Sequence, residues 1–154
     1  MAHTQALSSN GAANGRKFGI VLVDDNETFR FACQAALESL PRVQVIASAP
    51  DGPSALTLVR ATTPDLVVLD VSMPGMGGLE VARQLKLLPN ASPFVFLSMN
   101  CSAEYRLIAS HMGATDFICK KDMFEQLLPL VRSLAQGLGD AIPAVGTPFQ
   151  GDEQ

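Results

Sequence analysis

Five side chains that could take part in chemistry each stand at the end of a short apolar run: Asp24, Asp25, Asp70, Ser98 and Lys120. Carboxylates brought close together repel one another and raise one another's pKa, so such a group needs a compensating cation. Oxygen ligands suit Mg²⁺, which binds through one or two carboxylates plus a phosphate and keeps several waters. The ammonium group of Lys120 could contact an anionic substrate group as a point charge. The five residues therefore indicate metal-assisted chemistry on an anion, provided that the fold gathers them.

The apolar runs predict five β-strands. They are rich in Val, Ile, Leu and Phe and do not alternate with polar residues, which is typical of strands buried on both faces of a parallel sheet. The runs are residues 18–23, 43–47, 66–69, 94–97 and 117–119.

Helical spacing of apolar residues fills the segments between the runs. Asn26 is a candidate N-cap, and Pro53 suits a first helical turn. Asp122, with Glu125 three residues later, resembles a capping box, and Pro129 predicts a kink or a broken turn in the last helix. The expected apolar faces of the last two helices are Leu107, Ile108 and Met112, and Phe124, Leu127, Leu128, Val131 and Leu134.

Five strands and five helices in strict alternation predict a doubly wound α/β sheet. In such sheets, ligands bind beyond the carboxyl ends of the strands, where the strand order reverses. This is the edge at which the five chemical residues stand, so the fold class predicts that they share one site.

Length, composition and charge restrict the partners and the location that we expect for this protein. The chain has 154 residues, 47% of them apolar, and a net charge of −4, which disfavours nucleic acid and anionic membranes as partners. No apolar stretch is long enough for a membrane span, and the N-terminus does not resemble a signal peptide, so we expect a cytoplasmic protein with reduced thiols. Residues 1–16 are expected to be a flexible segment, 17–136 the folded domain, and 137–154 a flexible acidic tail or truncated linker.

The residues at the strand ends resemble a known family, the receiver domains of two-component response regulators (CheY-like). The resemblance covers about residues 17–136. It rests on Val-Asp-Asp at 23–25, Val-Val-Leu-Asp-Val-Ser-Met-Pro-Gly-Met-Gly-Gly-Leu-Glu at 67–80, Phe-Leu-Ser at 96–98 and Gly-Ala-Thr-Asp-Phe-Ile-Cys-Lys at 113–120. It implies a flavodoxin-like (βα)5 sandwich with strand order 2-1-3-4-5. The Gly-Ala-x-x-Phe stretch favours the NarL-type branch.

The resemblance also implies roles. Asp70 would accept a phosphoryl group from the phosphohistidine of a sensor histidine kinase or a histidine phosphotransfer protein. Asp25, Asp70 and the backbone carbonyl of Ser72 would bind Mg²⁺, with Asp24 close by or acting through water. Lys120 would contact a phosphoryl oxygen. The chain would be a self-catalysed phosphoacceptor with possible autodephosphorylation rather than an enzyme.

A second set of implied roles concerns signal output. Ser98 would turn inward to a phosphoryl oxygen, and Phe117 would be the rotating aromatic near the surface formed by the fourth helix, fifth strand and fifth helix. Ser72, Met99 and Asn100 would tune the phosphate lifetime, with Met99 narrowing access to Asp70. The output would pass to a protein partner or a fused domain, and a homodimer is possible.

Plainer interpretations stay open for each residue. Asp24, Asp25 and Asp70 could be turn or cap residues, and Ser98 could satisfy a backbone group at its strand end. Phe117 could be core, whereas Lys121 is expected to face solvent. Cys101 and Cys119 stand near the ends of neighbouring strands and could form a redox pair, but buried thiols are favoured for both and for Cys33. His3 and His111 have no motif around them.

Two other functions compete with the stand-alone receiver. One is a receiver fragment of a NarL-type DNA-binding regulator. The other is a Mg²⁺-dependent aspartyl-phosphate phosphatase or phosphotransferase; haloacid-dehalogenase phosphatases need a second Asp two residues after the nucleophile, where this chain has Ser72. The cognate kinase, pathway, phosphate lifetime, oligomeric state and any redox role of the cysteines cannot be derived from the sequence.

Overall fold

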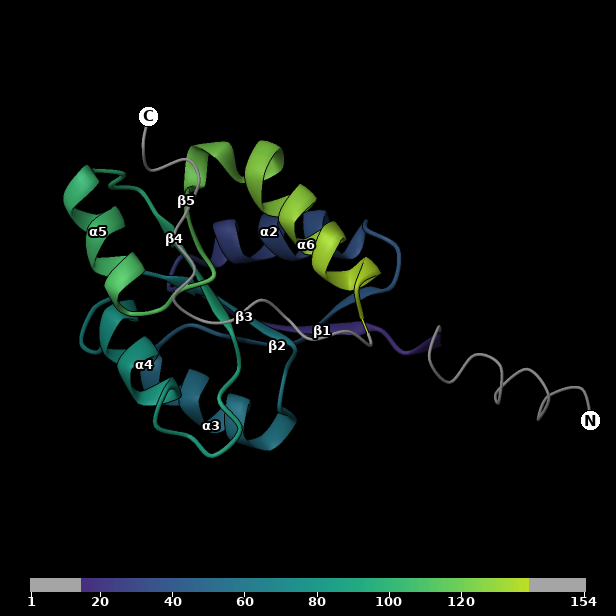
Figure 1. Cartoon of the computed structure of the whole chain (residues 1–154), viewed down its shortest axis with the longest axis horizontal. Coiled ribbons are helices and arrows are strands. Elements are labelled where there is room, and N and C mark those ends of the chain that lie inside the picture. The colour runs from purple at the N-terminus through teal and green to yellow at the C-terminus, as the bar shows by residue number, and fades with distance from the viewer. Residues whose placement is uncertain (1–14, 139–154) are drawn as a thin grey trace, which may run out of the picture.

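The computed structural model describes residues 15–138, which form a five-stranded parallel sheet between two layers of helices (Figure 1). The strands are β1 (Phe18–Val23), β2 (Val43–Ala49), β3 (Leu66–Asp70), β4 (Phe94–Ser98) and β5 (Asp116–Cys119). Their order is β2-β1-β3-β4-β5, and every neighbouring pair is parallel. The predicted flavodoxin-like architecture is therefore confirmed.

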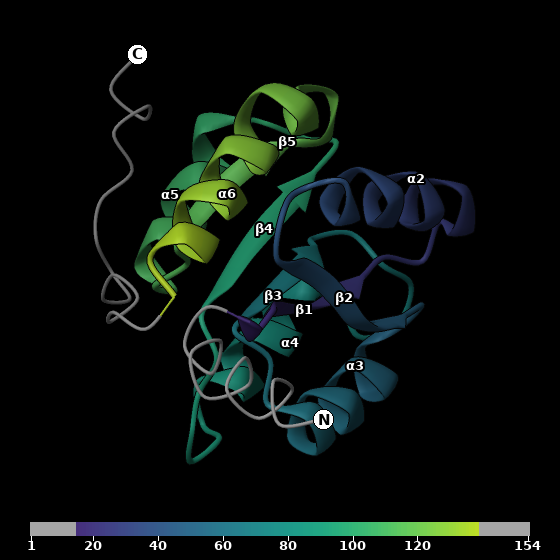
Figure 2. The same cartoon turned by 90° about the vertical axis from the view of Figure 1, so that its right-hand side faces the viewer.

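Five α-helices connect and follow the strands in the described part of the chain. They are α2 (Glu27–Glu38), α3 (Gly52–Thr62), α4 (Gly78–Leu85), α5 (Ala103–His111) and α6 (Leu128–Gln136). Helices α2 and α6 cover one face of the sheet, and α3, α4 and α5 cover the other (Figures 1 and 2). The reversal of strand order lies between β1 and β3, where such a sheet opens its ligand site.

Alternation along the strands divides the core between the two faces. Ile20 and Leu22 of β1 pack toward α2 and α6, whereas Val21 and Val23 pack toward the other layer. Strands β1, β3 and β4 are buried at every residue, as their unbroken apolar runs predict. Strand β2 has mixed burial because it lies at the edge of the sheet, and it runs two residues beyond the predicted end.

The helix starts follow the predicted cap chemistry in two places. The Asn26 side chain accepts a hydrogen bond from the Phe29 backbone N–H at 2.9 Å, and Pro53 lies in the first turn of α3. Asp51, which caps α3, accepts from the Ser54 N–H at 2.8 Å, and this bond lowers the pKa of its carboxyl.

The predicted capping box is wrong, and of the two alternatives at Pro129 the structure shows a break in the helix. Asp122 makes no side-chain cap hydrogen bond, because the chain leaves β5 through a 3-10 turn (Lys120–Asp122) and a π turn (Met123–Leu127) before α6 begins. These turns leave Phe124 61% exposed instead of on the apolar face. Pro129 lies in the first turn of α6, where a missing N–H costs nothing, so the break there is the start of a new helix.

The predicted apolar face of α5 is confirmed for Met112 and wrong for Leu107 and Ile108. Leu107 is 59% exposed and Ile108 39% exposed. The stripe that packs on the sheet instead runs through Tyr105, Ala109 and Met112, of which only Ala109 is fully buried. In this short helix, the apolar residues do not form one clear stripe, so their spacing does not by itself decide which of them reach the core.

The predicted terminal segments, 1–16 and 137–154, fall almost wholly outside residues 15–138, and so does His3. Within the described residues, no helix has both the length and the apolar character to cross a membrane.

Candidate functional site

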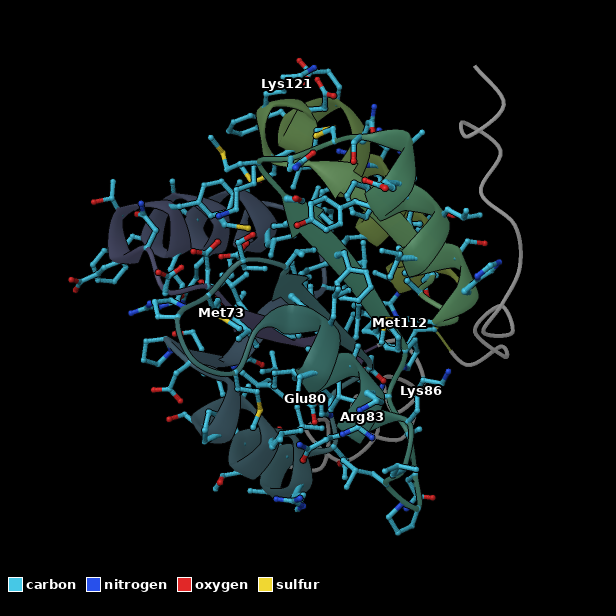
Figure 3. The ribbon with its side chains drawn as sticks, turned by 90° about the vertical axis from the view of Figure 1, so that its left-hand side faces the viewer. Met73, Glu80, Arg83, Lys86, Met112 and Lys121 are labelled. Carbon is cyan, nitrogen blue, oxygen red and sulfur yellow. A yellow bond between two sulfur atoms is a disulfide. The ribbon has the colours of Figure 1, made fainter. Side chains whose placement is uncertain are left out.

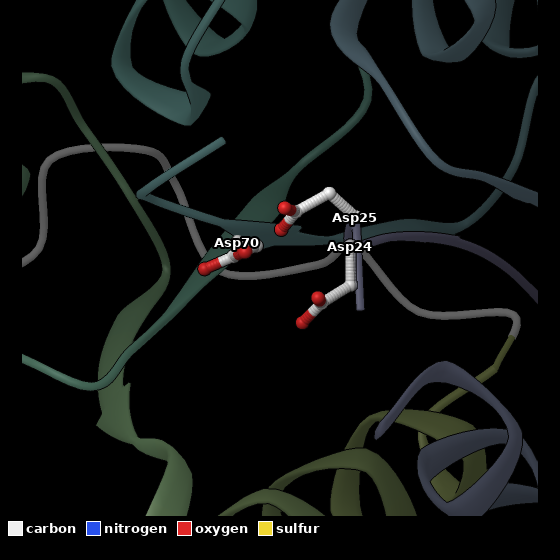
Figure 4. Close-up of side chains that lie close together, drawn as sticks. All are labelled: Asp24, Asp25 and Asp70. Atoms are coloured by element: carbon white, nitrogen blue, oxygen red, sulfur yellow. The ribbon is translucent and has the colours of Figure 1, made fainter. Parts of the chain in front are cut away.

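Three carboxylates meet at the carboxyl end of the sheet (Figure 4). Asp24 and Asp25 directly follow β1, and Asp70 is the last residue of β3. These strands are parallel neighbours, so their ends meet at one edge, and one oxygen of each carboxylate lies within 4.8 Å of the others. Asp24 and Asp70 are buried, whereas Asp25 is exposed.

Local backbone contacts hold these carboxylates only in part. Asp24 Oδ1 accepts from the Asn26 N–H at 2.8 Å, and Arg30 Nη1 donates to the Asp24 carbonyl at 2.7 Å. Asp70 Oδ1 accepts from the Ser72 N–H at a long 3.3 Å. The buried Asp24 Oδ2 has no partner among the described residues other than the Lys120 ammonium, 2.7 Å away. The cluster therefore keeps oxygen lone pairs available for another ligand.

Lys120 supplies the opposite charge. Its Nζ lies 2.7 Å from Asp24 Oδ2 and 3.5 Å from Asp70 Oδ1, as ion pairs, and its side chain is 10% exposed. The same ammonium lies 4.5 Å from the centre of the Phe29 ring, a cation–π contact. Lys121, by contrast, is 78% exposed beside Asp122 and lies at the outer edge of the molecule (Figure 3).

The charge at this edge is incompletely balanced. Burial, and then the neighbouring Asp24 charge, raise the pKa of Asp70 from 3.8 to about 7, although Lys120 and the Ser72 N–H lower it. A hard divalent cation would relieve this repulsion. Mg²⁺ prefers oxygen ligands, and three carboxylate oxygens within 4.8 Å of one another fit this ion.

Three contributors were missed by the sequence analysis. A Cβ at Gly78 would collide with the Asp70 carbonyl, so glycine lets α4 start directly against the end of β3, where the Gly78 N–H donates to Val71 O at 2.8 Å. The other two are Phe29 and Arg30 on the first turn of α2. The Gly-Gly pair within residues 67–80 was a usable signal, whereas Phe29 and Arg30 carried none.

The Ser98 hydroxyl is hydrogen-bonded to the backbone of a neighbouring residue. It is buried at the end of β4, and its hydroxyl donates to the Asn100 carbonyl at 2.8 Å while accepting from the Asn100 N–H at 3.0 Å. These bonds match the plainer interpretation, a side chain that satisfies backbone at a strand end. A switch role would require Ser98 to exchange both bonds for a phosphoryl oxygen.

Phe117 is buried in the core at 1% exposure, and the Arg106 guanidinium lies 5.3 Å from the centre of its ring. Met99 is 82% exposed. Ser72 and Asn100 are also exposed, so all three predicted lifetime-tuning residues lie on the solvent side of the site.

The prediction of three reduced thiols is wrong for two of them. A disulfide joins Cys101 to Cys119, with sulfur drawn yellow in Figure 3, whereas Cys33 is buried and free as expected. The reason is register: β4 and β5 pair Ser98 with Cys119, and the turn after Ser98 returns Cys101 over that strand end.

Comparison with known proteins decides the family, since the model of the response regulator receiver domain matches residues 20–132. The chain belongs to the receiver domain family of response regulators. Receiver domains act in phosphorelay signalling, with phosphorylation and Mg²⁺ binding as general features of the family.

Relatives carry this domain within longer proteins. The chain is 31% identical over 129 residues to the transcriptional regulatory protein DegU of Brevibacillus brevis, covering 83% of the chain and 54% of DegU. It is 38% identical over 103 residues to a protein-glutamate methylesterase/protein-glutamine glutaminase of Desulfotalea psychrophila, covering 66% of the chain and 28% of that protein. The receiver thus spans about half or less of these relatives.

Solved structures agree. The signal receiver domain assigned to the response regulator NarL of Mycobacterium tuberculosis matches with a TM-score of 0.73 and 30% identity, over 79% of this chain and 98% of that one. A LuxR-family two-component response regulator of Aurantimonas sp. SI85-9A1 has the same TM-score and identity, over 79% and 86% of the two chains.

Proposed function

We propose that Asp70 of this receiver accepts a phosphoryl group from a phosphohistidine of a sensor histidine kinase or phosphotransfer protein. The observation that carries this proposal is the convergence of three carboxylate oxygens within 4.8 Å, with Lys120 Nζ 3.5 Å from Asp70. This arrangement suits phosphoryl transfer, which demands positioning and charge neutralisation more than covalent work from the protein.

In the proposed reaction, an Asp70 oxygen attacks phosphorus in line with the nitrogen of the donor histidine. The P–N bond breaks as the P–O bond forms, leaving an acyl phosphate on Asp70. Lys120 neutralises a phosphoryl oxygen, since its ammonium group already lies between Asp24 and Asp70.

The residues that would hold Mg²⁺ are Asp25, Asp70 and the Ser72 carbonyl, with Asp24 beside them or linked through water. The ion, when bound, supplies positive charge to the carboxylates and to the transferring phosphoryl oxygens. Asp24 keeps its buried side chain directed toward this position through its contacts with Asn26 and Lys120.

The proposed output is a shift of the surface formed by α5, β5 and α6. Phosphorylation adds about −1.5 to −2 charge beside the β4–α5 loop. Ser98 would leave Asn100 for a phosphoryl oxygen, and Phe117 would move with the loop. Because α5 buries only Ala109 completely, it is the helix that such a shift would move at least cost. Ser72, Met99 and Asn100 border the site and would set the acyl-phosphate lifetime.

The remaining assignments complete this proposal. We place the protein in the cytoplasm and describe it as a self-catalysed phosphoacceptor that passes its signal to a downstream protein or a fused output domain. Its net charge of −4 disfavours direct contact of this domain with nucleic acid. The relatives' longer chains support the alternative of an output domain on the same polypeptide. Homodimerisation on phosphorylation is a further element of the proposal.

The test is incubation of the full chain with Mg²⁺ and acetyl phosphate, followed by intact mass spectrometry. One phosphoryl group should add to the wild type and none to Asp70→Asn. Lys120→Ala should accumulate the adduct roughly tenfold more slowly, the value of one charge-assisted contact, whereas the adjacent Lys121→Ala should match the wild type. An Asp70→Asn variant that still takes the group would overturn the assignment.

A phosphatase is the competing function. Turnover of a generic phosphomonoester with release of phosphate over many cycles would favour that enzyme over a switch. The receiver proposal expects one phosphorylation event per chain and no such turnover.

A further inference from the structure

The disulfide between Cys101 and Cys119 crosses the part of the fold that would have to move during switching. It joins the turn after β4 to the last residue of β5, with the two Cα atoms 5.7 Å apart, a spacing suited to a disulfide. The two cysteines are 18 positions apart in sequence, and the segment between them contains the whole of α5. The bond therefore closes α5 into a covalent loop with the strand it packs beside.

Both ends of this bond touch the candidate site. Cys119 is paired in register with Ser98 and directly precedes Lys120. At the other end, the Cys101 sulfur lies 3.5 Å from the Ser98 carbonyl, within the turn in which Asn100 occupies the Ser98 hydroxyl. A covalent tie between residues 101 and 119 thus holds the turn in the conformation in which Ser98 is unavailable.

We propose that Cys101 and Cys119 form a reversible thiol–disulfide site that adds a redox input to this receiver; the inference rests on the proposed function. In the oxidised state, the disulfide pins the 99–102 turn and keeps Ser98 on Asn100. In the reduced state, the turn is free to bring Ser98 to the phosphoryl group on Asp70. Oxidation therefore lowers the response to phosphodonors.

The chemistry is exchange with a small disulfide such as oxidised glutathione. The half-buried Cys101, as thiolate, attacks one sulfur of the reagent, and one thiol leaves. The Cys119 thiolate then displaces the second reagent thiol as the Cys101–Cys119 bond forms. Two cysteine thiols are oxidised, one reagent disulfide is reduced, and both protons and both electrons pass to the two reagent thiols.

The surroundings favour this pair. Arg106 Nη2 lies 3.5 Å from the Cys119 sulfur, where a cation stabilises negative charge on the attacking atom. The third cysteine, Cys33, is buried on α2, and burial raises the pKa of its thiol to about 12, so it does not compete. In the cytoplasm that we propose for this chain, disulfides are usually transient and redox-sensing rather than structural.

The experiment uses the full chain equilibrated in buffers of reduced and oxidised glutathione. Alkylation with iodoacetamide and mass spectrometry count free thiols, and acetyl phosphate with Mg²⁺ then measures acyl-phosphate accumulation in the same samples. The oxidised form should show one free thiol and roughly tenfold slower accumulation, matching the loss of a charge-assisted hydrogen bond. Cys101→Ser and Cys119→Ser should lose the redox difference, whereas Cys33→Ser should keep it.

Three free thiols at every glutathione ratio would overturn the proposal, and so would equal phosphorylation of the oxidised and reduced chains. If neither form is phosphorylated, the proposed function fails instead. Amide hydrogen exchange of residues 98–102 then decides the inference separately, because a pinned turn must exchange more slowly in the oxidised chain. Equal exchange in both forms would reject it without any use of the phosphorylation assay.

Discussion

Two aspartates stand at the opposite ends of β3, and their surroundings differ. Asp65, just before the strand, accepts from Arg16 Nη2 and from the Gly19 N–H, both at 2.8 Å. Asp70, five residues later, has one long backbone hydrogen bond at 3.3 Å and an ion pair at 3.5 Å, and it is buried beside another carboxylate.

The difference separates a carboxylate that stabilises the fold from the one that we propose as the phosphoryl acceptor. Asp65 receives a donor on each oxygen, so its charge stabilises the fold by joining the starts of β1 and β3. The negative charge of Asp70 is only partly balanced by Lys120 and the Ser72 N–H. It therefore opposes folding and remains available to a cation or a phosphoryl group. The apolar contacts on both faces of β3 are what hold Asp70 in place.

The largest expected effect is a gain of stability from Asp70→Asn in metal-free solution. The folded chain has an Asp70 pKa near 7 against an ordinary 3.8, so it binds more protons than the unfolded chain between these values. The contribution of Asp70 to stability is therefore greatest below pH 3.8 and is lost as pH rises toward 7, by up to about 4 kcal/mol, so the variant should gain on the wild type over this range. Urea unfolding from pH 4 to 8 measures it, and a wild type that gains on the variant with rising pH would contradict the comparison.

Two glycines, Gly78 at the start of α4 and Gly19 near the start of β1, test the contrast between the surroundings of Asp70 and Asp65. Gly78→Ala should destabilise the chain by about 3 kcal/mol, because the new Cβ meets the backbone carbonyl of Asp70, which cannot yield. Gly19→Ala is the matched control: its Cβ would lie 3.2 Å from the flexible Ile46 Cδ1, so a smaller cost is expected. Equal midpoints of denaturation for the two variants would show that the α4 start is not tightly seated on Asp70.

Removal of the satisfied carboxylate should have the opposite sign to removal of Asp70. Asp65→Ala is expected to cost about 2 kcal/mol, since the buried Gly19 N–H loses its acceptor. Arg16→Ala removes only the half-exposed ion pair and should cost less than about 1 kcal/mol. Thermal unfolding at pH 7 compares the two, and a stabilising Asp65→Ala would remove the distinction drawn between the aspartates.

The last prediction is stabilisation by Mg²⁺. At tenfold its dissociation constant, the ion should stabilise the folded wild type by about 1.4 kcal/mol. Asp70→Asn should lose most of this gain, and Asp65→Asn should retain it. A melting temperature that rises equally in all three proteins would indicate non-specific salt effects instead of a site at the carboxyl end.

Much of this site could be predicted from local sequence. The runs before Asp24 and Asp70 are buried on both faces, and parallel strands must end at a common edge, so the carboxylates had to converge. Lys120, the last residue of the 113–120 stretch, was expected at the site and Lys121 in solvent; the ion pairs put the Lys120 ammonium beside the carboxylates and leave Lys121 78% exposed. The Asn26 cap and the Pro53 turn also depend only on neighbours in sequence.

Other features depended on long-range geometry. Because 3-10 and π turns follow β5, Phe124 is exposed and Asp122 makes no side-chain cap hydrogen bond. Helix α5 buries Ala109 and leaves Leu107 and Ile108 largely exposed. Neither the turns after β5 nor the orientation of α5 follows from the spacing of apolar residues alone, because a short helix can bury more than one set of them.

The order of apolar runs and the residue types at their ends were enough to define the parallel sheet and its acidic edge, because burial and chain direction are encoded locally. The tertiary structure alone decided which atoms touch: Cys101 with Cys119, Ser98 with Asn100, and Gly78 against Asp70. Such contacts depend on strand register and turn shape to within an ångström. A pattern of residue types does not specify atomic positions this closely, whereas side-chain packing on both faces of the sheet does.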